Sequence, residues 1–326
     1  VAALESGAQG EWLAGLNRYL GHYRDAPVAL TRPGSDIFPA LAGAEPARPA
    51  SEGPLISVLM PVYNAEKTLA YAVRSILGQS WRNLELIAVD DASTDASWPM
   101  LLRLAAADPR LRPIRLPLNV GPYVAKTLGL QQARGQCITG HDADDWALPR
   151  RLERHMAAGA DPVSLIWGLR LTPEGRPSHI SRAGTETSSD GFNRRAPISA
   201  MFDAAFLRER LGGWDSVRFG ADTEMLERAE HALGHKIAEK PVIGLLCRDA
   251  PDSLSNDRTH GTRARNGRIS DSRSTYLQMT RGWLAEQAPE ASLTLPFPHL
   301  PRRFPAPEPM LVPESALSVL TAQPAR

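Results

Sequence analysis

The chain has 326 residues, of which 43% are hydrophobic, so it is long enough to bury a substantial core. Its 37 basic and 36 acidic residues leave a formal net charge of +1, which excludes an overall field that attracts nucleic acid. No stretch approaches the about 18–20 consecutive apolar residues that span a bilayer, so we expect a cytoplasmic protein that is soluble or contacts a membrane only at its periphery.

Residues 1–53 are predicted to be an appendage to the main domain. One amphipathic helix is indicated there, because apolar side chains recur at helical spacing: Trp12, Leu13, Leu16, Tyr19 and Leu20. Residues 31–53 are rich in proline, glycine and alanine, which favours an irregular linker over a packed element. The main domain is therefore expected to begin near residue 54.

Residues 54–160 alternate between strand and helix patterns. Strands are predicted at 55–60, 84–89, 111–116 and 136–140, and helices at 65–79, 94–107 and 123–134. This alternation predicts an α/β fold, a Rossmann-like and mainly parallel sheet flanked by helices. Ligands of such sheets bind at the carboxyl ends of the strands.

The regular alternation fades after residue 160, and residues 161–288 are predicted to form a smaller mixed region. Its predicted elements are strands at 163–172 and 196–202, a helix at 221–233, one or two strands at 236–247 and a closing helix at 270–288. Cys137 and Cys247 match neither a disulfide framework nor a thiolate metal site, so they indicate core residues in a reducing compartment. The proline-rich tail, 289–326, is expected to run extended over the surface.

Asp142-Ala143-Asp144-Asp145 places three carboxylates within four residues at the end of a predicted strand. At about 5 Å and an effective dielectric near 20, each carboxylate pair repels by roughly 3 kcal/mol, so the cluster favours a bound cation. Oxygen ligands alone indicate Mn²⁺ or Mg²⁺. The alternative is a solvated turn whose acids cap the following helix.

Four motifs in order complete the pattern: Pro61-Val62-Tyr63-Asn64, Val89-Asp90-Asp91, Asn119-Val120-Gly121 and His141 to Asp145. Together they resemble the family 2 glycosyltransferases of the GT-A fold, densely over 54–160 and loosely over 161–247. The resemblance implies a nucleotide-sugar site lined by Pro61, Tyr63, Asn64 and Asp91. Tyr63 can stack on a base, and Asp91 can accept a hydrogen bond from a base imide, which favours uracil. The alternatives are a buried tyrosine and a helix-capping aspartate.

The resemblance also assigns roles to the acidic residues. It implies that Asp144 and Asp142 hold the metal, with Asp142 also facing the nucleotide and Asp145 in a supporting or sugar-contacting role. Asp222 stands where the family carries its catalytic base, but Ala221 replaces the usual preceding glutamate, so Glu224 is an alternative. Both acids could instead serve only the N-terminal turn of a helix.

Further departures and candidates lie outside these motifs. Lys126-Thr127 stands in place of a usual Arg-Asn pair, which leaves Lys126 a cationic role toward the donor. Trp214 is predicted either to form an acceptor platform or to anchor a turn. A polar segment, 252–267, is expected to fold over the diphosphate with basic side chains in and around it: Arg248, His260, Arg263, Arg265 and Arg268.

We therefore expect an inverting, metal-dependent glycosyltransferase of polysaccharide or glycoconjugate biosynthesis. It would move a sugar from a nucleotide sugar, a UDP-sugar by the reasoning above, to a hydroxyl of a glycan acceptor. A nucleotide-sugar-binding module without activity is the alternative, because a fold does not guarantee a function. A nucleotidyltransferase is a third reading, but Asn64-Ala65-Glu66-Lys67 is not the glycine-rich phosphate loop that it needs.

Overall fold

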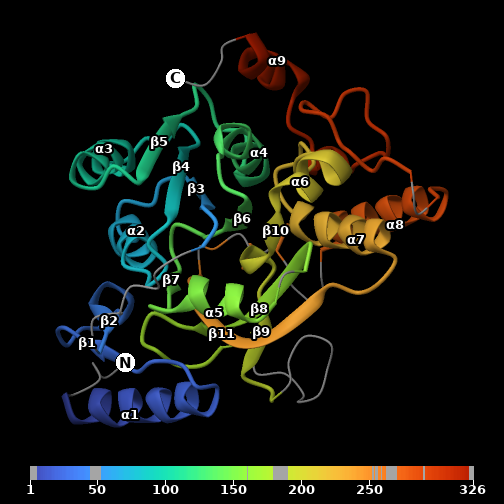
Figure 1. Cartoon of the computed structure of the whole chain (residues 1–326). Coiled ribbons are helices and arrows are strands. Elements are labelled where there is room, and N and C mark those ends of the chain that lie inside the picture. The colour runs from blue at the N-terminus through green and yellow to red at the C-terminus, as the bar shows by residue number, and fades with distance from the viewer. Residues whose placement is uncertain are drawn as a thin grey trace.

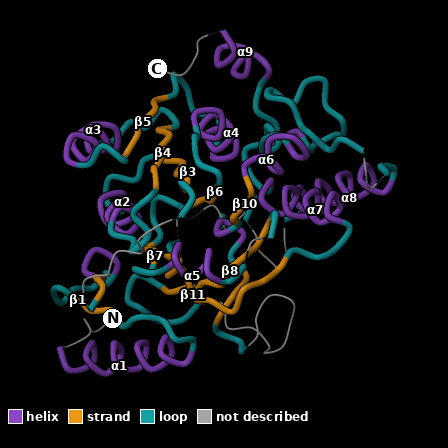
Figure 2. The backbone as a smooth tube through the Cα atoms, in the orientation of Figure 1, coloured by secondary structure: helices purple, strands orange, loops and turns teal. Residues whose placement is uncertain are grey.

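The structure, a computed structural model, describes residues 6–44, 53–159, 161–178, 190–251, 253, 256–257, 259–261, 270–288 and 291–322 (Figure 1). Within these residues, a nine-stranded sheet carries helices on both faces, and a separate two-stranded sheet lies near the N-terminus (Figure 2). No helix in the described part of the chain is both long and apolar enough to cross a membrane.

The first half of the large sheet confirms the predicted parallel arrangement. Its strands are neighbours in the order β5-β4-β3-β6 and all pair in parallel. The chain leaves the central strand β3 toward β5 and returns to β6 on the other side, which creates a switch point at the carboxyl ends of β3 and β6. The elements are β3 (Ile56–Val62), α2 (Leu69–Leu77), β4 (Leu84–Asp90), α3 (Ser97–Ala107), β5 (Leu111–Arg115), α4 (Pro122–Gln132) and β6 (Cys137–Gly140).

The second half of the sheet is mixed, as predicted. Strand β10 is antiparallel to β6 and β8, β8 is parallel to β11, β7 is antiparallel to β11, and β9 pairs with β8. Helices α7 and α8 pack together beside this half (Figure 1). The elements are β7 (Trp146–Ala147), α5 (Arg151–Ala157), β8 (Val163–Leu171), β9 (Asn193–Arg195), η2 (Pro197–Ser199), β10 (Met201–Asp203), α6 (Ala204–Phe206), η3 (Leu207–Leu211), α7 (Ala221–Leu233), β11 (Ala238–Arg248) and α8 (Asp271–Ala285).

The single strand predicted at 196–202 is wrong. The structure has β9 ending at Arg195, the short helical turn η2, and then β10 beginning at Met201. Pro197 opens the turn, and a proline has no N–H group to donate to a strand ladder. An apolar run interrupted in this way cannot remain one strand.

Two hydrophobic cores lie on opposite faces of the sheet. Along β3 and β4 the side chains alternate, so Leu59, Ile87 and Val89 enter one core while Val58 and Leu86 enter the other. Helices α4, α7 and α8 belong to the first core, and α2 and α3 belong to the second. The sheet is thus buried on both faces over its parallel half, as the near-continuous apolar strands require.

The N-terminal segment packs more fully than predicted. The expected helix is confirmed as α1 (Ser6–His22), but the region predicted as an irregular linker, 31–53, contains η1 (Phe38–Ala40) and β2 (Leu41–Gly43), and β2 pairs with β1 (Val28–Leu30) just before it. Phe38 is fully buried, and its ring lies 5.9 Å from that of Tyr71 on α2. A few adjacent apolar residues therefore outweigh the loop-like composition around them, while 45–52 lie outside the described residues.

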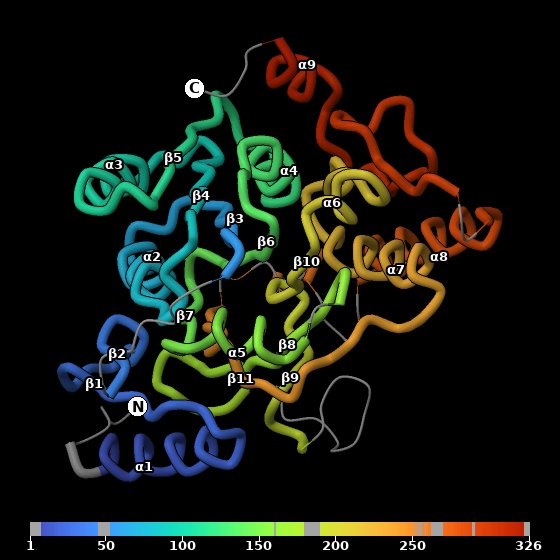
Figure 3. The backbone as a smooth tube through the Cα atoms, viewed as in Figure 1, coloured from blue at the N-terminus to red at the C-terminus, as the bar shows by residue number. Residues whose placement is uncertain are grey.

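The proline-rich C-terminal segment is also a correction, because it does not run as an extended chain over the surface. It forms η4 (Glu308–Met310) and α9 (Glu314–Ala322), and its apolar side chains Leu295, Phe304 and Met310 are almost fully buried in the first core. Figure 3 shows this segment lying against α6 and α8. Its prolines break regular structure without preventing apolar burial.

Replacing Phe304 with alanine is expected to lower the free energy of unfolding by roughly 3–5 kcal/mol, as for other buried phenylalanines. Phe304 is 2% exposed and contacts the rings of Tyr276 and Trp283. Denaturant unfolding of the variant measures the loss. A change below about 1 kcal/mol would contradict a packed C-terminal segment, because surface substitutions have effects of that size.

His155 provides a pH prediction. Burial is the main cause that lowers the pKa of His155 to about 3, and the nearby positive charge of Arg151 adds to it. In the unfolded chain His155 binds a proton near pH 6.5, whereas in the folded protein it stays neutral until about pH 3. This group therefore lowers the stability of the fold as the pH falls from 6.5 toward 3. We expect His155→Gln, which can keep the hydrogen bond to Ser164, to flatten the decline of the unfolding temperature over that range. An unchanged pH profile would contradict this.

Candidate active site

Two loops at the carboxyl ends of β3 and β4 are bound to each other. The Asn64 N–H donates to Ser93 Oγ (3.0 Å), and the Thr94 N–H donates to Asn64 Oδ1 (2.9 Å). Asn64 and Ala92 have φ of +47° and +58°, which is uncommon for residues other than glycine and often marks a functional loop. Tight mutual hydrogen bonding holds both loops in this conformation.

Tyr63 and Pro61 lie at the end of β3, where the sequence predicted a nucleotide pocket. The Tyr63 side chain is 52% exposed, so the alternative of a buried tyrosine is wrong. Pro61 is partly buried within β3 and lies opposite Val89 of β4. An exposed ring on a fixed loop is a surface on which a flat base can stack.

Asp91 follows β4 and is almost fully buried. Its carboxylate accepts hydrogen bonds from Asn119 Nδ2 (2.9 Å), the Val120 N–H (2.8 Å) and the Gly121 N–H (2.7 Å). Burial raises the pKa of Asp91, although the two backbone bonds oppose the rise. Asp91 therefore fixes the start of α4, and a carboxylate with about four acceptor positions keeps one for a ligand.

The acidic segment lies between β6 and β7, at the carboxyl end of β6. Burial and the neighbouring Asp142 carboxylate raise the pKa of Asp144 to about 7, against the opposing charge of Arg248. Burial also raises the pKa of Asp142 and that of Asp145. Asp142 and Asp144 remain partly exposed, whereas Asp145 is buried and accepts a hydrogen bond from the Arg248 N–H (2.9 Å). Asp145 is thus tied to β11, and Asp142 and Asp144 are the accessible pair.

The backbone of the acidic segment is held by residues that the sequence analysis did not identify. Tyr71 Oη donates to the Asp144 carbonyl (2.7 Å), and buried Arg151 donates to the Gly140 carbonyl (2.7 Å). Burial, with the Arg151 charge beside it, lowers the pKa of His141 well below its usual value, so His141 is neutral. The sequence around Tyr71 and Arg151 gives no signal for this role, because their contacts join α2 and α5 to the segment that follows β6.

Lys126 and Tyr123 of α4 face Asp222 at the first turn of α7. Lys126 Nζ lies 3.0 Å from Asp222 Oδ1, and Tyr123 Oη donates to Asp222 Oδ2 (3.2 Å). The Lys126 ammonium also lies over the ring of Trp214, 5.8 Å from its centroid. A small pocket beside these groups is lined in part by Gly140, Ile198, Phe202 and Met225. The structure therefore brings the predicted base and the predicted cation together.

Glu224, the alternative base, is enclosed. Its side chain is fully buried and pairs with equally buried Arg228, whose Nε lies 2.6 Å from Glu224 Oε1. Arg228 also donates to the carbonyls of Leu211 and Gly213. Glu224 thus braces α7 against the preceding loop, and between the two candidates only Asp222 is open to a ligand.

Thr127 and Trp214 explain part of the altered family pattern. Trp214 is 7% exposed, and its N–H donates to Thr127 Oγ1 (3.0 Å), while its ring meets Phe202 edge to face. Trp214 anchors the loop before α7, which is the second of its two predicted roles. Gly213 is required here, because a Cβ at this position would lie 2.5 Å from the Thr127 methyl group.

The predicted basic segment is described only in part. Arg263, Arg265 and Arg268 lie outside the described residues. The His260 ring stacks on Phe219 with centroids 4.9 Å apart. Arg248 pairs with Asp36 of the N-terminal segment, with Arg248 Nη2 2.9 Å from Asp36 Oδ2. The N-terminal segment therefore reaches the edge of the acidic segment, which the sequence did not indicate.

A parallel sheet that gathers polar and acidic side chains at its carboxyl edge is the architecture of nucleotide-binding α/β domains. Residues 57–209 match the model of glycosyl transferase family 2. These residues form a family 2 glycosyltransferase domain, and the observed sheet confirms the predicted GT-A type of fold.

Two relatives found by sequence agree with this assignment. The chain is 43% identical over 103 residues to an uncharacterized glycosyltransferase of Haemophilus influenzae, covering 32% of this chain and 41% of the relative. It is 33% identical over 224 residues to the succinoglycan biosynthesis protein ExoO of Rhizobium meliloti, covering 62% of this chain and 63% of that protein. A crystal structure of S. aureus TarS 1-349 in complex with UDP-GlcNAc aligns with a TM-score of 0.49 at 19% identity, covering 61% of this chain and 59% of the TarS chain. The chain thus matches less than two thirds of each relative.

Proposed function

We propose that this protein is an inverting, metal-dependent glycosyltransferase. It transfers a sugar from a nucleotide sugar, a UDP-sugar, to a hydroxyl of a glycan acceptor in polysaccharide biosynthesis. The family 2 domain and the naming of ExoO for succinoglycan biosynthesis support this class of reaction. The observation that carries the proposal is an accessible carboxylate, Asp222, fixed by Lys126 and Tyr123 on the side of the site facing the acidic segment.

In this proposal Asp222 is the general base. Inversion requires a base opposite the leaving group, which removes the proton of the acceptor hydroxyl as its oxygen attacks the anomeric carbon. Each Asp222 oxygen accepts one hydrogen bond from α4, and each keeps a further lone pair for the acceptor proton. Lys126 and Tyr123 hold the carboxylate in one orientation, which is the requirement for proton transfer at a defined position.

Asp142 and Asp144 are the proposed metal ligands. Among the described residues, no group of three or more His, Cys, Asp or Glu side chains is placed to hold a metal ion. Mg²⁺ and similar ions, however, commonly use only one or two carboxylates and take their other ligands from substrate phosphates and water. The raised pKa values of this pair fit such a site, because burial and the neighbouring carboxylates make ionisation costly, and a bound cation removes that cost. When bound, the metal would offset the charge of the departing nucleoside diphosphate.

The nucleotide would lie at the carboxyl ends of β3 and β4. Tyr63 offers its exposed ring to the base, and Asp91 keeps an acceptor position for a base imide, as uracil provides. Asn64 and Pro61 fix the loop that carries Tyr63. Asp145 supports the acidic segment from β11.

A panel of nucleotide sugars, each incubated with Mn²⁺, Mg²⁺ or a chelator, tests this proposal. We expect release of nucleoside diphosphate from a UDP-sugar, dependent on the metal and increased by a glycan acceptor. Release from a guanine or thymine nucleotide sugar alone would contradict the uracil assignment. Stoichiometric donor binding without turnover would instead indicate a binding module.

A further inference from the structure

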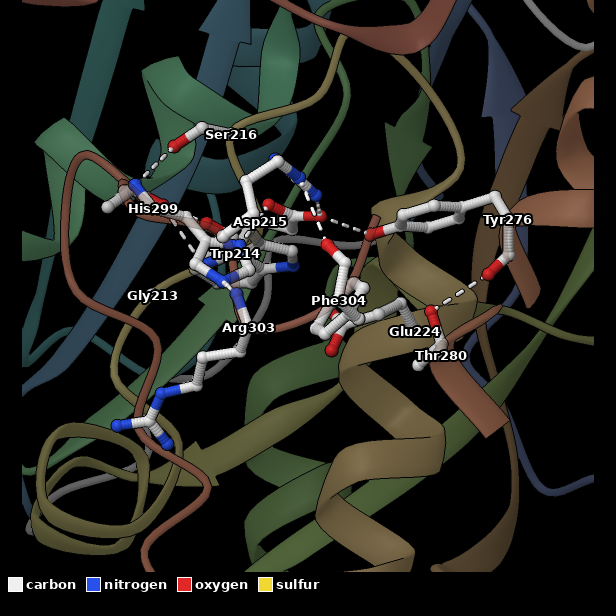
Figure 4. Close-up of polar contacts among 12 residues, drawn as sticks. Gly213, Trp214, Asp215, Ser216, Glu224, Tyr276, Thr280, His299, Arg303 and Phe304 are labelled. Atoms are coloured by element: carbon white, nitrogen blue, oxygen red, sulfur yellow. Dashed lines mark hydrogen bonds and ion pairs between the residues drawn. The ribbon is translucent and has the colours of Figure 1, made fainter. Parts of the chain in front are cut away.

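Asp215 is an enclosed anion in the loop that precedes α7. Its side chain is fully buried, and three donors from distant parts of the chain surround the carboxylate (Figure 4). Tyr276 Oη of α8 donates to Oδ2 (2.6 Å), Arg302 Nη2 binds the same oxygen, and His299 Nδ1 contacts Oδ1 (2.8 Å). A buried carboxylate with this many donors is strongly held in place.

The donors define the charge state of the cluster. Burial raises the pKa of Asp215, but the hydrogen bond from His299 and the charge of Arg302 outweigh it and bring the value to about 2. The other ring nitrogen of His299, Nε2, accepts from the Arg303 N–H (2.8 Å), so the proton of a neutral imidazole lies on Nδ1 and points at Asp215. Asp215 is therefore anionic and is paired with the positive charge of Arg302.

Backbone contacts extend the same junction along the loop. The Leu295 N–H donates to the Leu211 carbonyl (2.9 Å), and the Arg218 N–H donates to the Met310 carbonyl (2.8 Å). Gly212, with φ of +73°, permits the close approach at one end, because a Cβ there would lie 2.3 Å from the Leu295 carbonyl oxygen. The C-terminal segment is thus hydrogen-bonded to both ends of residues 211–218 and, through Asp215, to their middle.

The opposite side of this loop is the candidate active site. Trp214, the neighbour of Asp215, is bonded to Thr127 and lies beside Lys126, the partner of Asp222. Arg218 Nη1 donates to Asn119 Oδ1 (3.1 Å), and Asn119 in turn binds Asp91. The loop therefore joins the C-terminal segment to the proposed base and to the proposed nucleotide pocket.

We infer that Asp215 is a positioning residue: held by His299, Arg302 and Tyr276, it fixes the loop that places Asp222 against Lys126. This inference rests on the proposed function, since it assigns the placement of the base in that reaction. Asp215 itself touches no substrate, because it is fully enclosed. Through this junction the C-terminal segment helps to position the proposed base.

The test compares Asp215→Asn with the wild-type full chain. The amide keeps the size but removes the charge, and its NH₂ group must face a donor, because both carboxylate oxygens accept hydrogen bonds. We expect kcat to fall by about 10–10²-fold with the donor KM unchanged, as for a small displacement of a catalytic group. Backbone amide exchange should accelerate over residues 211–222 and not over β3 and β4.

Asp25→Asn is the matched control, since Asp25 is a buried aspartate paired with Arg154 away from the site. It should lower stability without changing kcat per folded molecule. If Asp215→Asn does not fold, Tyr276→Phe removes one of the three bonds while keeping the ring in the core. It should lower kcat by less than the asparagine change and accelerate exchange over the same residues.

Three results would overturn the inference. They are an unchanged kcat in the folded Asp215 and Tyr276 variants, unchanged amide exchange over residues 211–222, or an equal loss of kcat in Asp25→Asn. Failure of the proposed function would be distinct: the wild-type protein would transfer no sugar from any donor, while the exchange measurement would still report whether Asp215 fixes the loop.

Discussion

Replacing Asp222 with asparagine is expected to lower the rate of sugar transfer by about 10²–10⁴-fold, the usual contribution of a general base. The amide retains the size of the side chain and can still accept from Lys126 or Tyr123, but it cannot take the acceptor proton. Donor affinity should stay nearly unchanged, because the nucleotide would bind at the ends of β3 and β4. Single-turnover transfer and equilibrium donor binding measure the two quantities separately.

Glu227→Gln is the control for this change. Glu227 lies on the same helix, α7, and its contact is an ion pair with largely exposed Arg281, which contributes little to stability. It should transfer sugar at the wild-type rate. A normal rate in Asp222→Asn, with a large loss in a folded Glu224→Gln variant, would move the base to Glu224 and contradict the assignment.

Replacing Asp144 with asparagine is expected to weaken both metal binding and transfer, unlike the Asp222 change. The variant loses one of two accessible carboxylates, and the charge stabilisation that a metal supplies is worth several kcal/mol, or about 10²-fold or more in rate. Titration with Mn²⁺ followed by its paramagnetic signal reports binding directly. The rate at saturating Mn²⁺ then separates weak binding from impaired chemistry.

Asp108→Asn is the matched control for the metal prediction. Asp108 ends α3 and pairs with Arg110 on the surface, with Arg110 Nη2 2.7 Å from Asp108 Oδ2. It should leave Mn²⁺ binding and transfer unchanged. An Asp144→Asn protein with the wild-type Mn²⁺ affinity would show that Asp144 is not a ligand, and the acidic segment would then have only a structural role.

The parallel half of the sheet could be predicted because its signals are local. Strand β4, for example, is a largely apolar run of 7 residues, helix α2 shows its apolar periodicity within 9 residues, and the motif residues directly follow the strands. Asp91 and Asp142 could be placed at one edge of the sheet for the same reason, since parallel strands end together. The predicted helix at 221–233 agrees with α7, where Gly220 and Gly234 flank the helical run.

The rest depended on contacts between segments distant in sequence. The sequence left open whether Asp222 or Glu224 is the base. Only the contact with buried Arg228 showed that Glu224 is enclosed. Tyr71 and Arg151 gave no sequence signal, because each acts on the acidic segment from another helix. The strand predicted at 196–202 failed for a local reason instead: Pro197 lies inside the predicted run, and a proline has no N–H group to donate to the ladder.

The sequence by itself determined the α/β class, the family pattern and the edge of the sheet where chemistry is expected. Tertiary structure alone decided that the described part of 31–53, predicted as a linker, and the C-terminal segment, predicted as an extended tail, complete the two cores and reach the site through Asp36 and Asp215. The physical reason is that composition reports the local preference of a segment for regular structure. Burial of a few apolar side chains against a distant surface can outweigh that preference, and the surface exists only after the sheet has formed.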